Sequence, residues 1–442
     1  MSINVLIADD SQYLRKSISD ILKQHDLINI VDYAKDGIEA VSLVKKYSPD
    51  VLVLDLVMPK MNGLDAFKLI MDSRPTPTVI LSAISPKNLD SSIQALLMGA
   101  FDYIIKPGGL GAKDLPRFRE ELLAKVLLAS QSQIKKIFKT KKNVLSKHKS
   151  LRQEMVDRIF DFGQYINQLQ PIEEIEEERE TDTFEIMKVK AILKNENKSI
   201  VVDELSNKIE PKSTEQLEII KTKKQKPIAE ISKKKKESII IADLSPISGL
   251  ALTSKVIVMG ASVGGPRTIT TILKEIPKSF NTPILIVQHL SSHFTEAFAD
   301  NLNIECDLKV KVAENGDYLQ GGYVYITPGD MHMEITLDNK TPLLKIFKGT
   351  PVNFCMPSID VLFFSAAKIF RNRTMGILLT GMGSDGVNGL GAIKRVGGKT
   401  IAEAEETCIL YAMPKFAAEK GYADFIIPNY EIKDKMTTFI KS

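Results

Sequence analysis

Short apolar runs alternate with longer amphipathic stretches along residues 1–128. The amphipathic stretches, such as residues 11–25 and 36–47, have the 3.6-residue periodicity of helices that cover a core. The apolar runs have the length and composition of buried strands, and they are INVLIAD, NIVDYA, VLVLDL, TVILSA and YIIKP. Strands that alternate with helices favour a parallel sheet covered on both faces. We therefore expect an α/β domain with a five-stranded parallel sheet at residues 1–128.

A second α/β pattern covers residues 253–442. The runs KVIVMG, PILIVQH, YVYITP and MGILLTG predict strands, and residues 267–276, 357–370 and 386–397 predict helices. The runs YVYITP, MHMEITL and PLLKIF follow one another closely, which indicates antiparallel strands added to the sheet. We expect a doubly wound α/β domain with a mixed sheet.

Residues 129–252, between these two patterns, have blocks of like charge. Lysines cluster at 135–142, the acidic run IEEIEEERETD follows, and a KKKK run occupies 233–236. Such a composition is typical of a solvated linker, although residues 155–169 have the spacing of one amphipathic helix. We expect a long charged linker that is partly helical or disordered. A regulatory docking segment is the alternative.

Composition narrows the class of protein. A chain of 442 residues is long enough for two or more domains, and a net charge of +4 is too small to indicate a nucleic-acid-binding protein. Three cysteines are too few for a disulfide framework and favour a reducing compartment. The N-terminus lacks the pattern of a secretory signal, and no apolar run reaches the length of a membrane span. We expect a cytoplasmic protein without membrane insertion.

Acidic and phosphate-binding side chains follow the predicted strands of the first domain. Asp9 and Asp10 follow the first strand, Asp55 ends the third, Ser82 the fourth and Lys106 the fifth. The carboxyl ends of parallel strands meet at one edge, so these groups converge. Crowded carboxylates repel one another unless a cation lies between them, and Mg²⁺ prefers oxygen ligands. Asp55 can then attack a phosphoryl donor, while Lys106 and Ser82 bind the transferred phosphoryl oxygens.

These residues resemble the response-regulator receiver domain over residues 1–125. The segment DLVMPKMNGLD around Asp55, the Ser82-Ala83 pair and the Lys106-Pro107 pair carry the resemblance. It implies a flavodoxin-like fold, a histidine kinase as phosphodonor for Asp55, and a switching aromatic at Tyr103. The Mg²⁺ ligands would be Asp9, Asp10 and Asp55.

A glycine-rich turn, GASVGGP at residues 260–266, follows the first strand of the second domain. It matches the G-x-S-x-G pattern of a sharp strand-to-helix turn that presents a serine, here Ser262. A nucleotide-binding turn is the alternative, although the segment matches neither a P-loop nor G-x-G-x-x-G. The motif alone leaves a hydrolase and a binding loop equally open.

A histidine and an aspartate at other strand ends favour the hydrolase. His289 ends PILIVQH, and Asp385 lies in TGMGSDG just after another strand. An imidazole can take the proton of a serine hydroxyl, and a carboxylate orients the imidazole. The backbone N–H of Met382 is a candidate for the oxyanion hole. The rival bases are His293 and His332.

Other polar groups of this domain have simpler interpretations. Asp360, in PSIDVLFFSAA, is expected to cap a helix. The thiols have no motif that pairs them with a histidine, so structural roles are expected for Cys306, Cys355 and Cys408.

Residues 253–430 resemble the catalytic domain of chemotaxis protein-glutamate methylesterases. The segments that carry the resemblance, in the family's order, are GASVGGP, VQHLSSHFTEAF, YITPGDMH, MPSID, LLTGMGSDG and YAMPK. It implies Ser262 as nucleophile, His289 as base, Asp385 as its orienting group and the Met382 amide in the oxyanion hole. Two departures concern substrate positioning: Val263 stands where threonine is usual, and Met356 where arginine is common.

The two resemblances together imply a phosphorylation-regulated carboxylic ester hydrolase. It would hydrolyse γ-glutamyl methyl esters on methyl-accepting chemotaxis receptors, with glutamine deamidation as a second activity of the family. Mg²⁺ would serve the receiver domain, and the ester chemistry would need no cofactor. The alternative is a non-enzymatic response regulator whose second domain binds a protein partner or a nucleotide.

Overall fold

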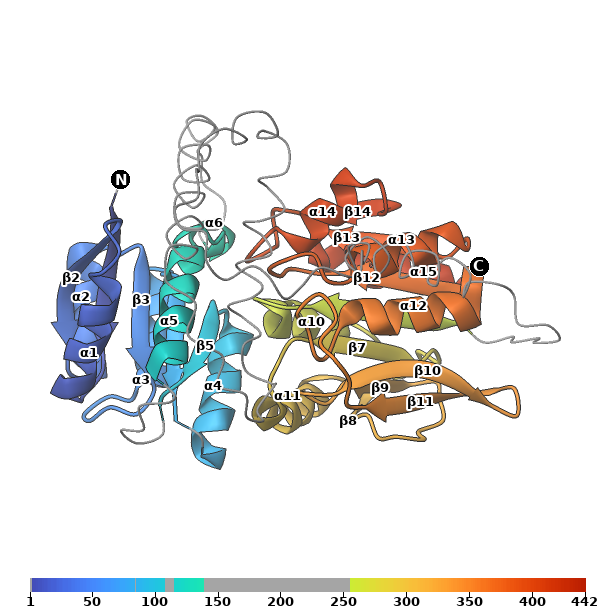
Figure 1. Ribbon diagram of the computed structural model, residues 1–442, viewed down its shortest axis with the longest axis horizontal. Helices are drawn as coiled ribbons and strands as arrows, with labels where there is room; N and C mark the ends of the chain where they lie inside the picture. Colours follow the sequence, from blue (N-terminus) through green and yellow to red (C-terminus); the bar gives the residue numbers. More distant parts are fainter. Residues whose placement is uncertain (1, 84, 108–114, 139–254) are drawn as a thin grey trace, which may run out of the picture.

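The computed structural model describes residues 2–83, 85–107, 115–138 and 255–442 (Figure 1). Two α/β units lie side by side, with the first unit drawn in blue and cyan and the second in yellow to red. Most of the predicted linker, including the helix expected at residues 155–169, lies outside the described residues. No helix in the described ranges is long and apolar enough to cross a membrane.

The first unit contains the five parallel strands that the sequence predicts. The sheet order is β2-β1-β3-β4-β5, so the chain crosses over between β2 and β3. Their bounds are β1 Ile3–Ala8, β2 Ile28–Ala34, β3 Val51–Asp55, β4 Thr78–Ser82 and β5 Asp102–Ile105. β1, β3 and β4 are almost completely buried because helices cover both faces, as the continuous apolar runs require.

The helices of this unit begin at polar caps directly after the strand-end loops. The side chain of Ser11 caps the first helix two residues after Asp9, and Asp36, Asn62 and Ser85 cap the next three. The acidic residues therefore stay in the loop at the sheet edge. The bounds are α1 Gln12–Leu22, α2 Gly37–Tyr47, α3 Gly63–Ser73, α4 Pro86–Met98, α5 Leu115–Ser130 and the short α6 Ile134–Phe138.

The second unit is built on a seven-stranded sheet whose strands are all parallel, in the order β14-β13-β12-β6-β7-β9-β8. The chain proceeds in one direction from β6 and in the other from β12, so the topological switch point lies between these neighbours. Ligands of doubly wound sheets bind at such a point. The strands are β6 Val256–Ala261, β7 Ile284–Gln288, β8 Lys309–Val312, β9 Tyr323–Ile326, β12 Thr374–Leu378, β13 Lys399–Glu403 and β14 Phe425–Ile427.

The expected antiparallel strands are present, but they form a separate sheet. β10 (His332–Asp338) pairs only with β11 (Thr341–Phe347) in a two-stranded hairpin. The position beside β9 is already taken by β8, whose polar sequence KVKV did not stand out as a strand. β10 packs against the helix α12 instead. The main sheet is thus parallel and not mixed.

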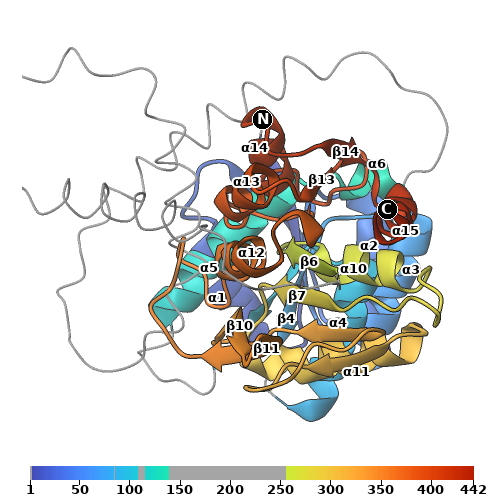
Figure 2. The same ribbon diagram turned by 90° about the vertical axis from the view of Figure 1, so that its right-hand side faces the viewer.

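Helices cover both faces of the second sheet (Figure 2). One layer contains α12, α13 and α14, and the other contains α10, α11 and α15. α12 approaches β6 so closely that a Cβ atom on Gly260 would lie 2.3 Å from Ile359. The bounds are α10 Gly265–Leu273, α11 Ser292–Glu305, α12 Ile359–Phe370, η2 Arg371–Arg373, α13 Val387–Arg395, α14 Met413–Glu419 and α15 Asn429–Lys441.

The two units share a packed interface. α4 lies against α10 and α11, as the adjacent ribbons in Figure 1 show. Apolar side chains from both units belong to one continuous buried cluster. Near the start of the predicted linker, the backbone amide of Gln133 donates to the carbonyl of Ile409 at 3.0 Å. The described residues that follow α5 therefore also contact the second unit.

Candidate active site and phosphorylation site

The predicted acidic residues of the first unit meet at the carboxyl edge of its sheet. Nζ of Lys106 lies 2.7 Å from Oδ2 of Asp55 and 2.9 Å from Oδ2 of Asp9. Asp9 and Asp55 are buried, whereas Asp10 is exposed. The hydroxyl of Ser82 lies at the same edge, where it accepts a hydrogen bond from Ser92 at 2.8 Å.

Burial and neighbouring charges shift the pKa values of Asp55 and Lys106 in opposite directions. Burial raises the pKa of Asp55 above its ordinary value, and the neighbouring Lys106 ammonium offsets part of that shift. Burial alone would lower the pKa of Lys106, but the carboxylates of Asp55 and Asp9 raise it overall. Lys106 is therefore a permanent cation between two carboxylates.

The same edge has the donor set of a Mg²⁺ site. One oxygen each from Asp9, Asp10 and Asp55 lie within 4.8 Å of one another. Three hard oxygen ligands, one of them at the surface, suit a cation that keeps several waters. This acidic triad is typical of a receiver-domain metal site.

Tyr103 lies at the interface between the two units. Its ring centroid is 4.0 Å from that of Phe294 in α11, and its hydroxyl donates to Oγ of Ser291 at 3.3 Å. Burial raises the pKa of Tyr103, so the phenol stays protonated. A residue of the first unit therefore contacts Ser291, which follows His289 by two positions.

Ser262 lies in a tight turn between β6 and α10. Gly264 has φ of 77°, a left-handed conformation that glycine adopts without strain, and the Gly265 amide donates to the carbonyl of Ser262 at 2.8 Å. A Cβ atom on Gly264 would come within 2.6 Å of Ile409. The two glycines thus allow the turn to lie flat against neighbouring loops at the switch point.

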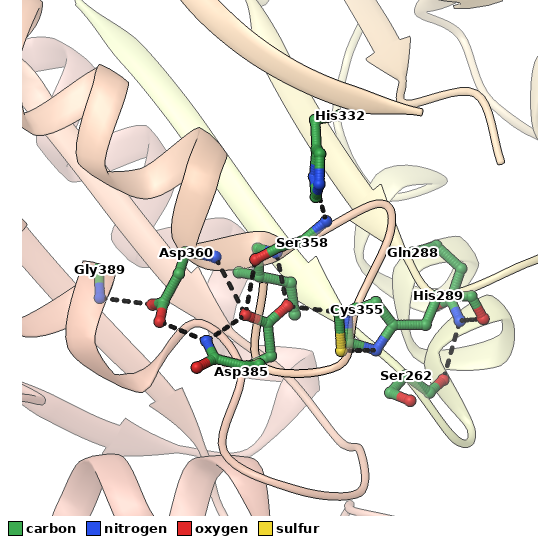
Figure 3. Close-up of polar contacts among 11 residues, drawn as sticks. Ser262, Gln288, His289, His332, Cys355, Ser358, Asp360, Asp385 and Gly389 are labelled. Atoms are coloured by element: carbon green, nitrogen blue, oxygen red, sulfur yellow. Dashed lines mark hydrogen bonds and ion pairs between the residues drawn. The ribbon is translucent and has the colours of Figure 1, made fainter. Parts of the chain in front are cut away.

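His289 and Asp385 form a buried pair beside this turn (Figure 3). Nε2 of His289 lies 3.0 Å from Oδ2 of Asp385, and each side chain is 2% exposed. Ala261 is paired with Gln288 across β6 and β7, so the residues that follow, Ser262 and His289, emerge side by side. The structure brings the three predicted residues to one sheet edge.

Asp385 is held by several donors in addition to His289. Its Oδ1 accepts from Oγ of Ser358 at 2.8 Å and from Nδ2 of Asn353 at 2.9 Å, and its Oδ2 accepts from the amide of Ile359 at 2.6 Å. Burial alone would raise the pKa of Asp385, but these donors and His289 keep it below its ordinary value. Asp385 is therefore ionised at neutral pH.

The two rival histidines have other surroundings. His293 is exposed in the first turn of α11. His332 is buried, its Nε2 donates to the carbonyl of Thr350 at 3.1 Å, and its Nδ1 accepts from the Ser358 amide at 3.2 Å. Both hydrogen bonds of His332 connect backbone segments, so it braces the loop between β11 and α12.

The loop that carries Met382 is supported on two sides. The Ser262 amide donates to the carbonyl of Thr380 at 3.0 Å, and a Cβ atom on Gly381 would come within 2.7 Å of Cβ of Ser262. The Thr380 amide in turn donates to Glu403 at 2.8 Å. Burial raises the pKa of Glu403, which lies at the end of a strand that the sequence did not predict.

The interpretation of Asp360 as the cap of its own helix is wrong. The N-cap of α12 is Ser358, and Asp360 accepts from the Gly389 amide at 2.6 Å and from Asn353 at 2.7 Å. Cys355, which no sequence motif pairs with a histidine, has its Sγ 4.0 Å from Nδ1 of His289. Asn353 and Cys355 both belong to the loop between β11 and α12, whose conformation has no sequence signature.

Comparisons with known proteins find relatives of both units. The response regulator receiver domain matches residues 5–112, and the CheB methylesterase domain matches residues 257–436. A protein-glutamate methylesterase/protein-glutamine glutaminase of Methanococcus maripaludis is 32% identical over 99% of this chain and 98% of its own length. The homologue from Pyrococcus horikoshii is 30% identical over 99% of this chain and 94% of its own. The chain belongs to the CheB methylesterase family.

A solved CheB catalytic domain covers part of the chain. The Thermotoga maritima CheB methylesterase catalytic domain is 39% identical, spans 43% of this chain and 99% of that one, and has a TM-score of 0.42. The CheB relatives named above match along both domains and the segment between them.

Proposed function

We propose that the chain is a phosphorylation-regulated protein-glutamate methylesterase. It hydrolyses γ-glutamyl methyl esters on chemoreceptors in chemotaxis adaptation. The names of the full-length relatives support the activity, and the buried His289–Asp385 pair beside Ser262 is the observation that carries the chemistry. The domains are a receiver at 1–128, a linker at 129–252 and the catalytic domain at 253–442.

In the reaction, Oγ of Ser262 attacks the ester carbonyl and His289 takes its proton. Asp385 stabilises the resulting imidazolium, and the Met382 amide donates to the developing oxyanion. His289 returns the proton to the departing methoxide, so methanol leaves and an acyl-serine remains. Water then attacks this ester with His289 again as base, which releases the glutamate and restores the Ser262 hydroxyl. The hydrogen-bond donors around Asp385 fix its carboxylate before substrate binds.

Because Nε2 of His289 is bound to Asp385, Nδ1 is the ring nitrogen left to accept the proton of Ser262. Nδ1 is therefore the base in this proposal, and Cys355 contacts it in the free enzyme. The same groups can deamidate glutamine, since His289 can protonate the amide nitrogen of the tetrahedral intermediate, so that ammonia leaves in place of methanol.

Phosphorylation of Asp55 by a histidine kinase supplies the regulation. Asp9, Asp10 and Asp55 would hold Mg²⁺, which would supply positive charge against the phosphoryl group, while Lys106 and Ser82 bind the phosphoryl oxygens. Transfer of Lys106 from the carboxylates to a phosphoryl group changes the receiver surface, and Tyr103 is the switching residue that meets the catalytic domain.

The receiver domain inhibits the esterase sterically in the unphosphorylated state. A small cavity between the domains is lined by receiver residues of β5 and α5, including Lys125 and Leu128, and by Val263 and Met382 next to the nucleophile. A bulky receptor helix cannot approach this edge while the receiver covers it. Phosphorylation weakens the contact and exposes the site.

The partners follow from this function. Methyl-accepting chemotaxis receptors are the substrates and a chemotaxis histidine kinase is the phosphodonor, which requires a cytoplasmic location. Neither nucleic acid nor membrane insertion is part of the proposal.

The deciding experiment measures methanol released from methylated receptor, with and without a small phosphodonor and Mg²⁺. Release should be slow without the donor and faster with it. Labelling of Ser262 by a fluorophosphonate probe distinguishes the hydrolase from a binding module. A protein that neither releases methanol nor reacts with the probe is not an esterase.

A further inference from the structure

A second buried carboxyl group, Asp360, lies beside the candidate catalytic aspartate. Asp385 and Asp360 are each 2% exposed, and Figure 3 shows them next to each other between α12 and the loop after β12. One amide joins them: Nδ2 of Asn353 donates to Oδ2 of Asp360 at 2.7 Å and to Oδ1 of Asp385 at 2.9 Å. Each hydrogen of this amide therefore serves a different carboxylate.

The loop that carries Asn353 is held in an unusual backbone conformation. Asn353 and Phe354 have φ of 52° and 61°, in the left-handed region that few residues other than glycine adopt. Reciprocal backbone hydrogen bonds between Val352 and Cys355, of 3.0 and 2.8 Å, close the turn. Strained residues persist where the surroundings over-determine them, and here the result is an amide aimed between two buried carboxylates.

Asp360 is fixed from its other side. Its Oδ1 accepts from the Gly389 amide in α13 at 2.6 Å, so the carboxyl group connects α13 to Asn353. A Cβ atom on Gly389 would lie 3.0 Å from that oxygen. The chain of contacts runs from α13 through Asp360 and Asn353 to Asp385 and His289.

We propose that Asn353 and Asp360 are a pair of positioning residues that fix the carboxylate of Asp385, and through it the ring of His289, for proton transfer. The proposal rests on the esterase function described above. Neither residue contacts Ser262 through the hydrogen bonds shown. Loss of the Asp360 carboxylate releases Asn353 from one partner, and loss of the Asn353 amide removes a charge-assisted hydrogen bond from Asp385.

The ionisation of Asp360 also affects the electrostatic environment of His289. Burial and the neighbouring Asp385 raise the pKa of Asp360 to about 7, although Gly389, Asn353 and Lys420 act in the other direction. Near the pair lie the imidazoles of His289, bound to Asp385, and of His332, which contacts the Ser358 backbone. Ionised Asp360 adds negative charge that favours an imidazolium at His289. Asp360→Asn removes that charge, so the acidic limb of the pH–rate profile should move to lower pH.

The test uses Asn353→Gly and Asp360→Asn in the full-length protein. Glycine accepts the left-handed backbone at position 353, and asparagine preserves the shape at 360. The controls are Asn339→Gly, an exposed asparagine with φ of 47° in the β10–β11 turn, and Asp424→Asn, a carboxylate that binds Thr400 away from the site. Melting temperatures check that each variant is folded.

Asn353→Gly should lower kcat for methanol release by about 10- to 100-fold, the effect of one lost hydrogen bond to a charged group, with KM changed little. Asp360→Asn should lower kcat less and shift the acidic limb, whereas the two controls should change neither. Fluorophosphonate labelling of Ser262 should slow in parallel, because it depends on the same base.

If folded Asn353→Gly retains wild-type kcat and labelling rate, while Ser262→Ala is inactive, the positioning role is wrong and the esterase function stands. If Asn353→Gly does not fold, Asp360→Asn decides: folded Asp360→Asn that keeps wild-type kcat, labelling rate and pH–rate profile overturns the proposal. Wild-type protein that releases no methanol and is not labelled would instead refute the esterase function itself.

Discussion

The two sites lie at equivalent edges of two parallel sheets, yet they hold their aspartates differently. Among the described contacts, Asp55 receives two donors: Nζ of Lys106 at 2.7 Å and the Val57 amide at 3.1 Å. Asp385 receives five, from the side chains of His289, Asn353 and Ser358 and from the backbone amides of Ile359 and Asp360. Lys106 is 20% exposed, whereas the His289 and Asp385 side chains are each 2% exposed.

The difference matches the tasks proposed for the two carboxylates. Asp55 must exchange its partner when it becomes phosphorylated, and it is held mainly by one partly exposed cation, Lys106. Asp385 must keep its charge and orientation throughout the reaction, and preorganised donors achieve this without rearrangement. A switch needs few, replaceable contacts, and a catalytic orienting group needs many fixed ones.

The largest expected effect comes from substitutions in the candidate active site, at Ser262, His289 and Asp385. Ser262→Ala should lower kcat by roughly 10³-fold or more, and His289→Ala nearly as much, because triad members act as a unit. Asp385→Asn should cost of the order of 10⁴-fold by favouring the wrong imidazole tautomer. Steady-state methanol release measures all three.

His293→Ala is the matched control, since that histidine is exposed in α11. It should retain activity within a few-fold. An inactive His293→Ala together with an active His289→Ala would assign the base to His293. Near-normal turnover by purified Ser262→Ala would remove the nucleophile from the proposal.

Removal of the proposed phosphorylation site, Asp55, should leave the candidate active site intact. Asp55→Asn should prevent phosphorylation, so stimulation by a phosphodonor disappears while basal activity remains. Mass spectrometry after treatment with a small phosphodonor and Mg²⁺ measures the phosphoryl group. Asp50→Asn is a suitable control because Asp50 precedes the same strand and binds Lys135 outside the pocket. A phosphoryl group on the Asp55→Asn protein would place the acceptor elsewhere.

The sequence predicted those parts of both sites that depend on strand ends. Asp9, Asp55 and Lys106, like Ser262, His289 and Asp385, each follow a strand, and parallel pairing brings strand ends together regardless of loop detail. The fold class was predictable for the same reason: long, continuous apolar runs have few alternatives to buried parallel strands.

The sequence did not predict the supporting groups. Asn353 reaches Asp385 through a turn with two non-glycine residues at positive φ, which no sequence pattern marks. Glu403 ends β13, a five-residue strand whose polar ends obscure it. The antiparallel hairpin was found, but its separation from the main sheet depends on the packing of β10 on α12, a tertiary contact.

Removal of the receiver domain tests how strongly it inhibits the candidate active site. A fragment starting near Thr253 should hydrolyse receptor esters several-fold faster than unphosphorylated full-length protein, because nothing covers the Ser262 edge. A small soluble ester should show a smaller difference, since it can pass a loose cover. A fragment that is no faster on receptor would exclude steric inhibition and point to recruitment or direct activation, with the linker's charged runs as the first candidates for docking.

The smallest expected effect comes from one hydroxyl group at the interface between the two units, that of Tyr103. The Tyr103 hydroxyl donates to Oγ of Ser291 at 3.3 Å and accepts from its amide at 3.4 Å, both long distances, while the ring contact with Phe294 survives in Tyr103→Phe. A net loss of about 1 kcal/mol should raise the uncovered fraction, and hence basal activity on receptor, by about 5-fold at most. Tyr13→Phe is the control, because Tyr13 is 69% exposed in α1. With phosphodonor present the Tyr103→Phe difference should shrink, since the contact is already open. If Tyr103→Phe instead changes activity equally with and without phosphodonor, the hydroxyl acts on the catalytic domain itself and not through the cover.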